Sequence, residues 1–105
     1  MPAARESKDG DIFVAMAHPL RRRILRHMVA IGTETSPRDL ADDLDQTLNK
    51  VSYHVLILAR CGTVEPTGTK QVRGSTQHFY RAAVEDEWAM LALEASADRP
   101  GEGRR

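Results

Sequence analysis

The chain has 105 residues, enough for one domain and too few for a second hydrophobic core. Hydrophobic residues make up 41% and charged residues 29%, close to globular usage, which excludes a wholly disordered chain or a fibrous repeat. The single cysteine excludes an internal disulfide. Because the apolar runs are far shorter than the roughly 20 residues of a membrane span, and no signal-peptide pattern opens the chain, we expect a cytoplasmic protein with no membrane partner.

The folded domain is expected to span residues 11–96. Residues 1–10 are small and polar, and residues 97–105 contain Gly, Pro and terminal arginines with nothing apolar to bury. We therefore expect both end segments to be disordered tails.

Two helices are expected at the start of this domain. The first covers Ile12–Ala17 with Asp11 as its N-cap, and it ends before Pro19, because a proline disfavours helical geometry in the preceding residue. The second begins at Pro19 and ends at Gly32, a typical C-cap residue. Its inward stripe has helical spacing and consists of Leu20, Ile24, Leu25, Met28 and Ile31.

Two more helices are expected on either side of a tight break. The run Ser36-Pro37-Arg38-Asp39 is typical of a helix start, with a capping hydroxyl, a first-turn proline and an acid that suits the helix dipole. After a break at Asp45-Gln46, a fourth helix is expected from Thr47 to Cys61, ended by Gly62. The inward residues of these two helices are Leu40, Ala41 and Leu44, and then Leu48, Val51, Val55 and Leu58.

A β-hairpin is expected next. Two strands, Thr63–Thr67 and Thr76–Ala82, are joined by a glycine-bracketed loop over residues 68–75 that carries two cations. Pro66 cannot donate a ladder hydrogen bond, so the first strand should be an edge strand or contain a bulge there. Of the two adjacent aromatic residues in the second strand, we expect Phe79 to face the core.

The last expected helix covers Val84–Ala95 and leaves its four acidic residues, Glu85, Asp86, Glu87 and Glu94, in water. We expect it to bury Val84, Trp88, Leu91, Ala92 and Ala95.

Charge is segregated along the chain although the 15 basic and 15 acidic residues cancel. Residues 18–27 and 46–83 are locally positive, whereas residues 33–45 and 84–98 hold most of the acids. Local field steers an anionic partner more than net charge does, so the zero balance does not exclude nucleic acid.

Two short helices with a tight break, followed by a hairpin with cations, predict an α+β fold, mostly α: a winged helix-turn-helix with a two-stranded β-hairpin wing. The helix over residues 47–61 fits a DNA major groove, and the wing reaches the backbone or the minor groove. For His54, a partly buried helix histidine is an equal alternative, and the arginine run at residues 21–26 is otherwise a solvated helix face. The expected DNA contacts are Arg22, Arg38, Gln46, Thr47, Asn49, Lys50, Ser52, Tyr53, His54, Lys70 and Arg73.

The sequence resembles the ArsR-like winged-helix transcriptional regulators over residues 12–95. The segments that carry the resemblance are AMAHPLRRRIL at 15–25, SPRDLA at 36–41, NKVSYHV at 49–55 and GSTQHFYR at 74–81. It implies a homodimer assembled through the first and last helices, acting more often as a repressor than as an activator. The implied subunit interface comprises Ile12, Phe13, Met16, Trp88, Met90 and Leu91.

The metal-sensing residues of many members of that family have no counterpart here, since the third helix has no cysteine and Val84–Ala95 has no histidine. We therefore expect no metal and no cofactor, with any small-molecule or protein effector left unidentified. Cys61 is expected to be a small half-buried residue, with a redox sensor as the alternative. No phosphate loop, nucleophile triad or open metal triad is present, so we expect no enzymatic activity.

The sequence thus predicts a sequence-specific regulator that binds double-stranded DNA as a dimer. The alternative is a winged-helix module that binds another protein through Leu56, Ile57 and the wing without binding DNA. A third hypothesis is a ligand-responsive sensor that uses Cys61 or a cavity between helices.

Overall fold

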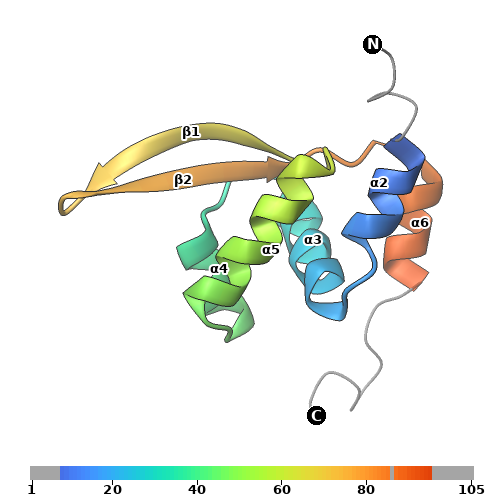
Figure 1. Cartoon of the computed structure of the whole chain (residues 1–105), viewed down its shortest axis with the longest axis horizontal. Helices are drawn as coiled ribbons and strands as arrows, with labels where there is room; N and C mark the ends of the chain where they lie inside the picture. Colours follow the sequence, from blue (N-terminus) through green and yellow to red (C-terminus); the bar gives the residue numbers. More distant parts are fainter. Residues whose placement is uncertain (1–7, 86, 96–105) are drawn as a thin grey trace.

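The computed structural model describes residues 8–85 and 87–95. The expected C-terminal tail and most of the N-terminal tail lie outside these residues. The elements follow one another as α2 (Lys8–Ala15), α3 (Pro19–Ile31), α4 (Pro37–Leu44), α5 (Leu48–Arg60), β1 (Val64–Val72), β2 (Ser75–Ala82) and α6 (Glu87–Ala95) (Figure 1).

Helices α3, α4 and α5 form the centre of the molecule, and the hairpin of β1 and β2 extends from them in one direction (Figure 1). Helices α2 and α6 lie side by side at the opposite end, where the rings of Phe13 and Trp88 approach to 5.7 Å between centroids (Figure 1). The expected mixture of helices with one two-stranded antiparallel sheet is confirmed.

The hydrophobic core lies where α3, α4 and α5 meet. Burial of each large aliphatic side chain stabilises the fold by roughly 1.5–3 kcal/mol, so this core fixes α5 against α4. Its largest fully buried apolar residues are Ile24, Leu25, Met28, Leu40, Val51, Val55 and Leu58.

The helix ends follow the sequence signals. The Oγ atom of Ser36 accepts a hydrogen bond from the Asp39 backbone N–H at 3.2 Å, as an N-cap residue should. His18 caps α3 in the same way, because its Nδ1 atom accepts from the Leu20 backbone N–H at 3.1 Å. Gly32 ends α3 in the left-handed conformation with φ of 75°. The expected caps of α3 and α4 are therefore confirmed.

The first and last helices differ from expectation at their N-terminal ends. Helix α2 begins at Lys8, so Asp11 lies inside the helix and is not its N-cap. Helix α6 begins at Glu87, and Val84 packs against the core from the preceding segment. Within α6, the residues turned to the core are Ala89 and Leu93, one helical turn apart, instead of Trp88 and Leu91.

The hairpin is longer than the sequence suggested, because most of residues 68–75 belong to the strands. The turn consists of Arg73 and Gly74 alone, both with positive φ, at 50° and 83°. Positive φ at both central residues defines a type I′ turn, whose twist matches that of the flanking strands. Pairing therefore continues to Val72 and Ser75, and Lys70 lies inside the hairpin opposite Gln77.

Strand β1 is the edge of the sheet, and its register shifts between Pro66 and Gly68, which confirms the expected bulge. Strand β2 has a second partner, because Tyr80 and Thr35 exchange two backbone hydrogen bonds of 2.8 Å. This bridge seats Tyr80 against the core cluster. The expectation that Phe79 would be the aromatic residue of this pair facing the core is therefore wrong.

Candidate nucleic-acid interface

One side of α5 is polar and open to solvent. Asn49, Lys50, Ser52 and Tyr53 are exposed, with 62% of the Tyr53 surface accessible, whereas the opposite side of the helix is buried in the core. The helix spacing places these four residues around the N-terminal half of α5. This end is the part of such a helix that reaches base edges when the helix lies in a major groove.

The break before α5 orients that end of the helix. Asp45 takes the left-handed conformation with φ of 57°, and the Gln46 backbone N–H donates to the Ala41 carbonyl at 2.9 Å. Thr47 then caps α5, its hydroxyl accepting from the Lys50 backbone N–H at 3.3 Å. Thr47 is exposed and Gln46 is half-buried, so the Thr47 side chain is open to solvent at the start of the helix.

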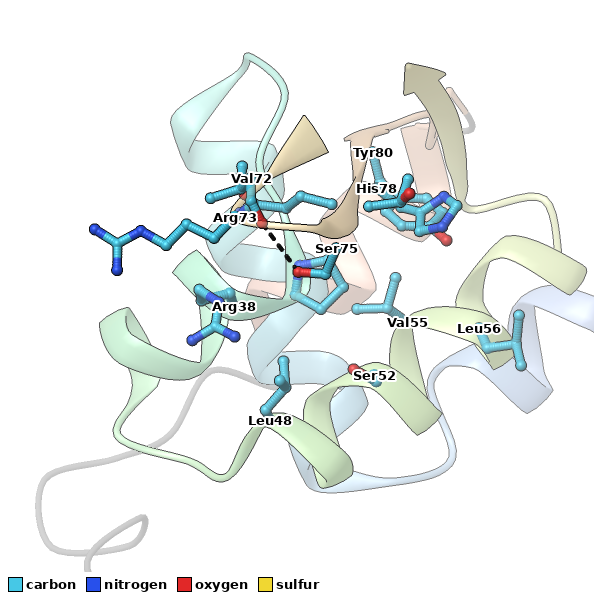
Figure 2. A pocket seen from close by; sticks show the side chains of 13 residues that line it. Arg38, Leu48, Ser52, Val55, Leu56, Val72, Arg73, Ser75, His78 and Tyr80 are labelled. Atoms are coloured by element: carbon cyan, nitrogen blue, oxygen red, sulfur yellow. Dashed lines mark hydrogen bonds between the residues drawn. The ribbon is translucent and has the colours of Figure 1, made fainter. Parts of the chain in front are cut away.

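Cations from two other elements face the same region. Arg38 lies in the first turn of α4, and Arg73 lies at the tip of the hairpin; both are exposed. Both line a groove of about 720 Å³ between α4, α5 and the hairpin (Figure 2). The structure thus brings Arg38, Arg73 and Ser52 of the expected DNA contacts together around one groove. Lys70 is exposed on β1 and does not line it.

The arginine run of α3 serves the protein's own backbone. Arg21 donates to the Val14 carbonyl at 3.1 Å, Arg22 to the Met16 carbonyl at 2.7 Å, and Arg23 to the Leu44 carbonyl at 3.2 Å. These acceptors lie at the C-terminal ends of α2 and α4, where helix carbonyls lack partners within the helix. Arg22, which was expected to contact DNA, thus holds a helix end in this structure, and a freely solvated face does not describe these three arginines.

His54 is also corrected, because only 6% of its surface is exposed and it lies on the inner side of α5. A guanidinium group can only donate hydrogen bonds, so Arg21 Nη1 donates to His54 Nδ1 at 3.2 Å. The His54 ring must therefore be neutral, with its proton on Nε2. The His18 ring lies 4.5 Å away. Burial lowers the pKa of His54, and the nearby His18, Arg21 and Lys50 lower it further.

The face shared by α2 and α6 carries exposed apolar side chains. Phe13 is 65% exposed, Leu91 63% and Trp88 42%. Two of the expected interface residues lie deeper: Ile12 is buried within the protomer, and Met16 packs against its core. Ile12 is therefore removed from the expected subunit interface. The sixth expected residue, Met90, is half-buried.

The remaining titratable groups in the part of the chain that the structure describes form no metal centre. His27 pairs with Asp43 at 3.0 Å, and Cys61 is half-buried against the core, as expected for a packing residue. Among residues 8–85 and 87–95, no group of three or more His, Cys, Asp or Glu side chains is placed to hold a metal ion. In the same part of the chain, no helix has the length and apolar character needed to cross a membrane.

Comparisons with known proteins agree with this geometry. Residues 16–65 match a family model described as a helix-turn-helix domain, which confirms the helix-turn-helix that the sequence predicted. No curated protein sequence matches the chain.

Two solved structures share the fold. One is a possible transcriptional regulatory protein from Mycobacterium bovis, a fragment of residues 1–100, with 22% identity, a TM-score of 0.62, and coverage of 90% of this chain and 92% of that chain. The other is the AntR antimony-specific transcriptional repressor, with 20% identity, a TM-score of 0.62, and coverage of 89% of this chain and 77% of that one.

Proposed function

We propose that this chain, whose residues 16–65 match a helix-turn-helix domain, is an ArsR-like transcriptional regulator that binds specific double-stranded DNA sequences as a homodimer and represses transcription by occupying promoters. The observation that carries the proposal is the exposed polar side of α5, whose Ser52 borders the same groove as the exposed Arg73 of the hairpin turn. The match to a helix-turn-helix domain indicates a DNA-binding regulator and not an enzyme, and such a regulator requires no catalytic group.

In this proposal α5 enters the major groove. The Asn49 amide is suited to a bidentate pair with adenine, and the Lys50 ammonium to guanine O6 and N7 or to a phosphate. Ser52 and Tyr53 add hydrogen-bonding groups on the same side of the helix. Gln46 and Thr47 lie at the start of the helix, within reach of the DNA backbone.

Cations outside α5 set the position on the duplex. We assign phosphate contacts to Arg38 and to Arg73, and a further backbone contact to Lys70 on the hairpin. Contacts of this kind carry little sequence information but make binding strongly salt-dependent, because each neutralised phosphate releases counterions.

The exposed apolar face of α2 and α6 supports the dimer. Phe13, Trp88 and Leu91 present a patch that is costly to leave in water, and a second copy of the chain would cover it. A two-fold dimer places two α5 helices on half-sites about one helical turn, roughly 34–36 Å, apart. The operator is then a palindrome of that spacing, and any small-molecule or protein effector is unidentified.

The experiment begins with selection of genomic DNA fragments that the purified protein retains. Fluorescence anisotropy then measures the affinity for a selected duplex at several salt concentrations. We expect a steep linear fall of log affinity with log salt. If no fragment is retained, or if the affinity for DNA does not change with salt concentration, binding in the DNA groove is excluded. The alternative, a module that binds another protein, is then favoured.

A further inference from the structure

The groove between α5 and the hairpin has a composition that DNA binding does not require. Three exposed aliphatic side chains border it: Leu48 and Leu56 from α5, and Val72 from the end of β1. The buried Val55 and the half-buried Tyr80 complete its apolar part (Figure 2). Phosphates and base edges gain little from aliphatic surface, so these residues indicate an apolar occupant.

The charge in the groove has one sign. Arg38 and Arg73 both line it, and its described lining includes no acidic side chain. Within residues 8–85 and 87–95, neither guanidinium has a hydrogen bond or an ion pair. Figure 2 shows both arginines on one side of the groove with Val72 and Leu48, Val55 near the middle and Leu56 on the other side, so apolar surface extends across the groove from the two cations.

From this arrangement we propose that the groove binds a small amphipathic organic anion, a carboxylate or sulfonate joined to an apolar body. The anionic group pairs with Arg38 and Arg73, for which charge-assisted and bidentate hydrogen bonds are available. The apolar body displaces water from Leu48, Val55 and Leu56. The groove volume of about 720 Å³ suits a ligand of drug-like size.

The site carries a regulatory consequence that rests on the proposed function. Arg38 and Arg73 are two of the three cations assigned to the DNA backbone, so a ligand that neutralises them competes with DNA. The same ligand fills the space between α5 and the hairpin, the two elements that approach the duplex. Binding of the anion therefore releases DNA, and the anion acts as an inducer.

The direct test uses the fluorescent anion 8-anilinonaphthalene-1-sulfonate with the full chain and no DNA. We expect saturable binding that weakens about fivefold or more in Leu56→Ser and in the double variant Arg38→Gln/Arg73→Gln. Ile31→Ser, which removes exposed apolar surface at the end of α3, outside both the groove and the proposed dimer face, is the matched control and leaves the groove affinity unchanged. Circular dichroism checks that each variant is folded, which Leu56→Ser should be because Leu56 is 48% exposed.

A second measurement locates the ligand without any substitution. In ¹H–¹⁵N correlation spectra, titration with decanoate should shift amide signals of α5 and of the hairpin around Arg73. Shifts concentrated on α2 and α6, or an absence of saturable shifts with both anions, would overturn the proposed site.

The regulatory consequence has a separate readout. Decanoate should weaken the binding of a selected duplex to the wild-type chain but have little effect on Leu56→Ser, which retains every proposed DNA contact. If the wild-type chain binds the anions but no DNA, the proposed function fails and the ligand site stands. If DNA binds and the anions do not, the ligand site alone fails.

Discussion

Replacement of Arg73 by Asn should raise the stability of the protein while weakening its binding to DNA. Arg73 has φ of 50°, a left-handed conformation that costs an ordinary L-residue about 1–2 kcal/mol. Asn-Gly is the preferred pair for a type I′ turn, so Arg73→Asn relieves much of this cost without altering the hairpin. For a domain of this size, a gain of about 1 kcal/mol raises the unfolding midpoint by roughly 4–8 °C.

The same substitution removes one cation from each hairpin tip, hence two from a dimer. The slope of log affinity against log salt should fall in magnitude by about 1.8, the sum of about 0.9 for each phosphate contact. Calorimetry measures the midpoint, and anisotropy on a selected duplex measures the slope. Arg38→Gln is the control, because Arg38 has ordinary helical backbone geometry. Its loss should reduce the salt dependence of DNA binding without raising the unfolding midpoint. A lower midpoint or an unchanged salt slope for Arg73→Asn would refute the reasoning.

Three further outcomes follow from other contacts. Ser36→Ala should lower the free energy of unfolding, measured by urea denaturation, by about 1–2 kcal/mol. The substitution removes the N-cap of α4 and also the acceptor of the Gln77 amide, which donates to Ser36 Oγ at 2.8 Å. A loss near zero would contradict this role. The lowered pKa of His54 means that this residue binds a proton more readily in the unfolded chain than in the folded one. The free energy of unfolding should therefore fall as the pH drops through and below about 6.5. His54→Gln should flatten this dependence of stability on pH, whereas His78→Gln, at an exposed position, should not. Leu91→Ser should shift the chain from dimer to monomer in sedimentation velocity, and an unchanged dimer would place the interface elsewhere.

The helices were predictable because local signals and packing agree. In α5, apolar residues at 51, 55 and 58 have the spacing of one helix face, and this face is the one that packs into the core. The cap at Ser36 and the bulge beside Pro66 also follow from chemistry within a few residues. Such features depend little on the rest of the fold.

The remaining features depend on partners that are distant in sequence. Arg22 was interpreted by its charge, but its role is set by a carbonyl at the end of another helix. Tyr80, and not Phe79, faces the core because Thr35 pairs with Tyr80 from the segment before α4. The hairpin length was missed because Arg73 is an uncommon residue at a position with positive φ, which hid the type I′ turn.

For His54 the sequence analysis left a DNA contact and a partly buried helix histidine as equal alternatives. His54 lies three residues after Val51 and four before Leu58, both buried, so the helical period favours the buried alternative. The structure satisfies the polarity of the ring with Arg21, so burial and polarity are compatible.

The central claim is that the exposed side of α5 reads base edges, and a comparison of selected DNA motifs tests it most directly. Fragments retained by the wild-type chain are compared with those retained by Asn49→Ala, by Lys50→Ala and by Arg73→Asn, all at one salt concentration. The account predicts that Lys50→Ala relaxes or changes base preference at a defined position in each half-site, while Arg73→Asn leaves the motif intact and only weakens binding. Identical motifs for the wild-type chain and for substitutions at both Asn49 and Lys50 would contradict it.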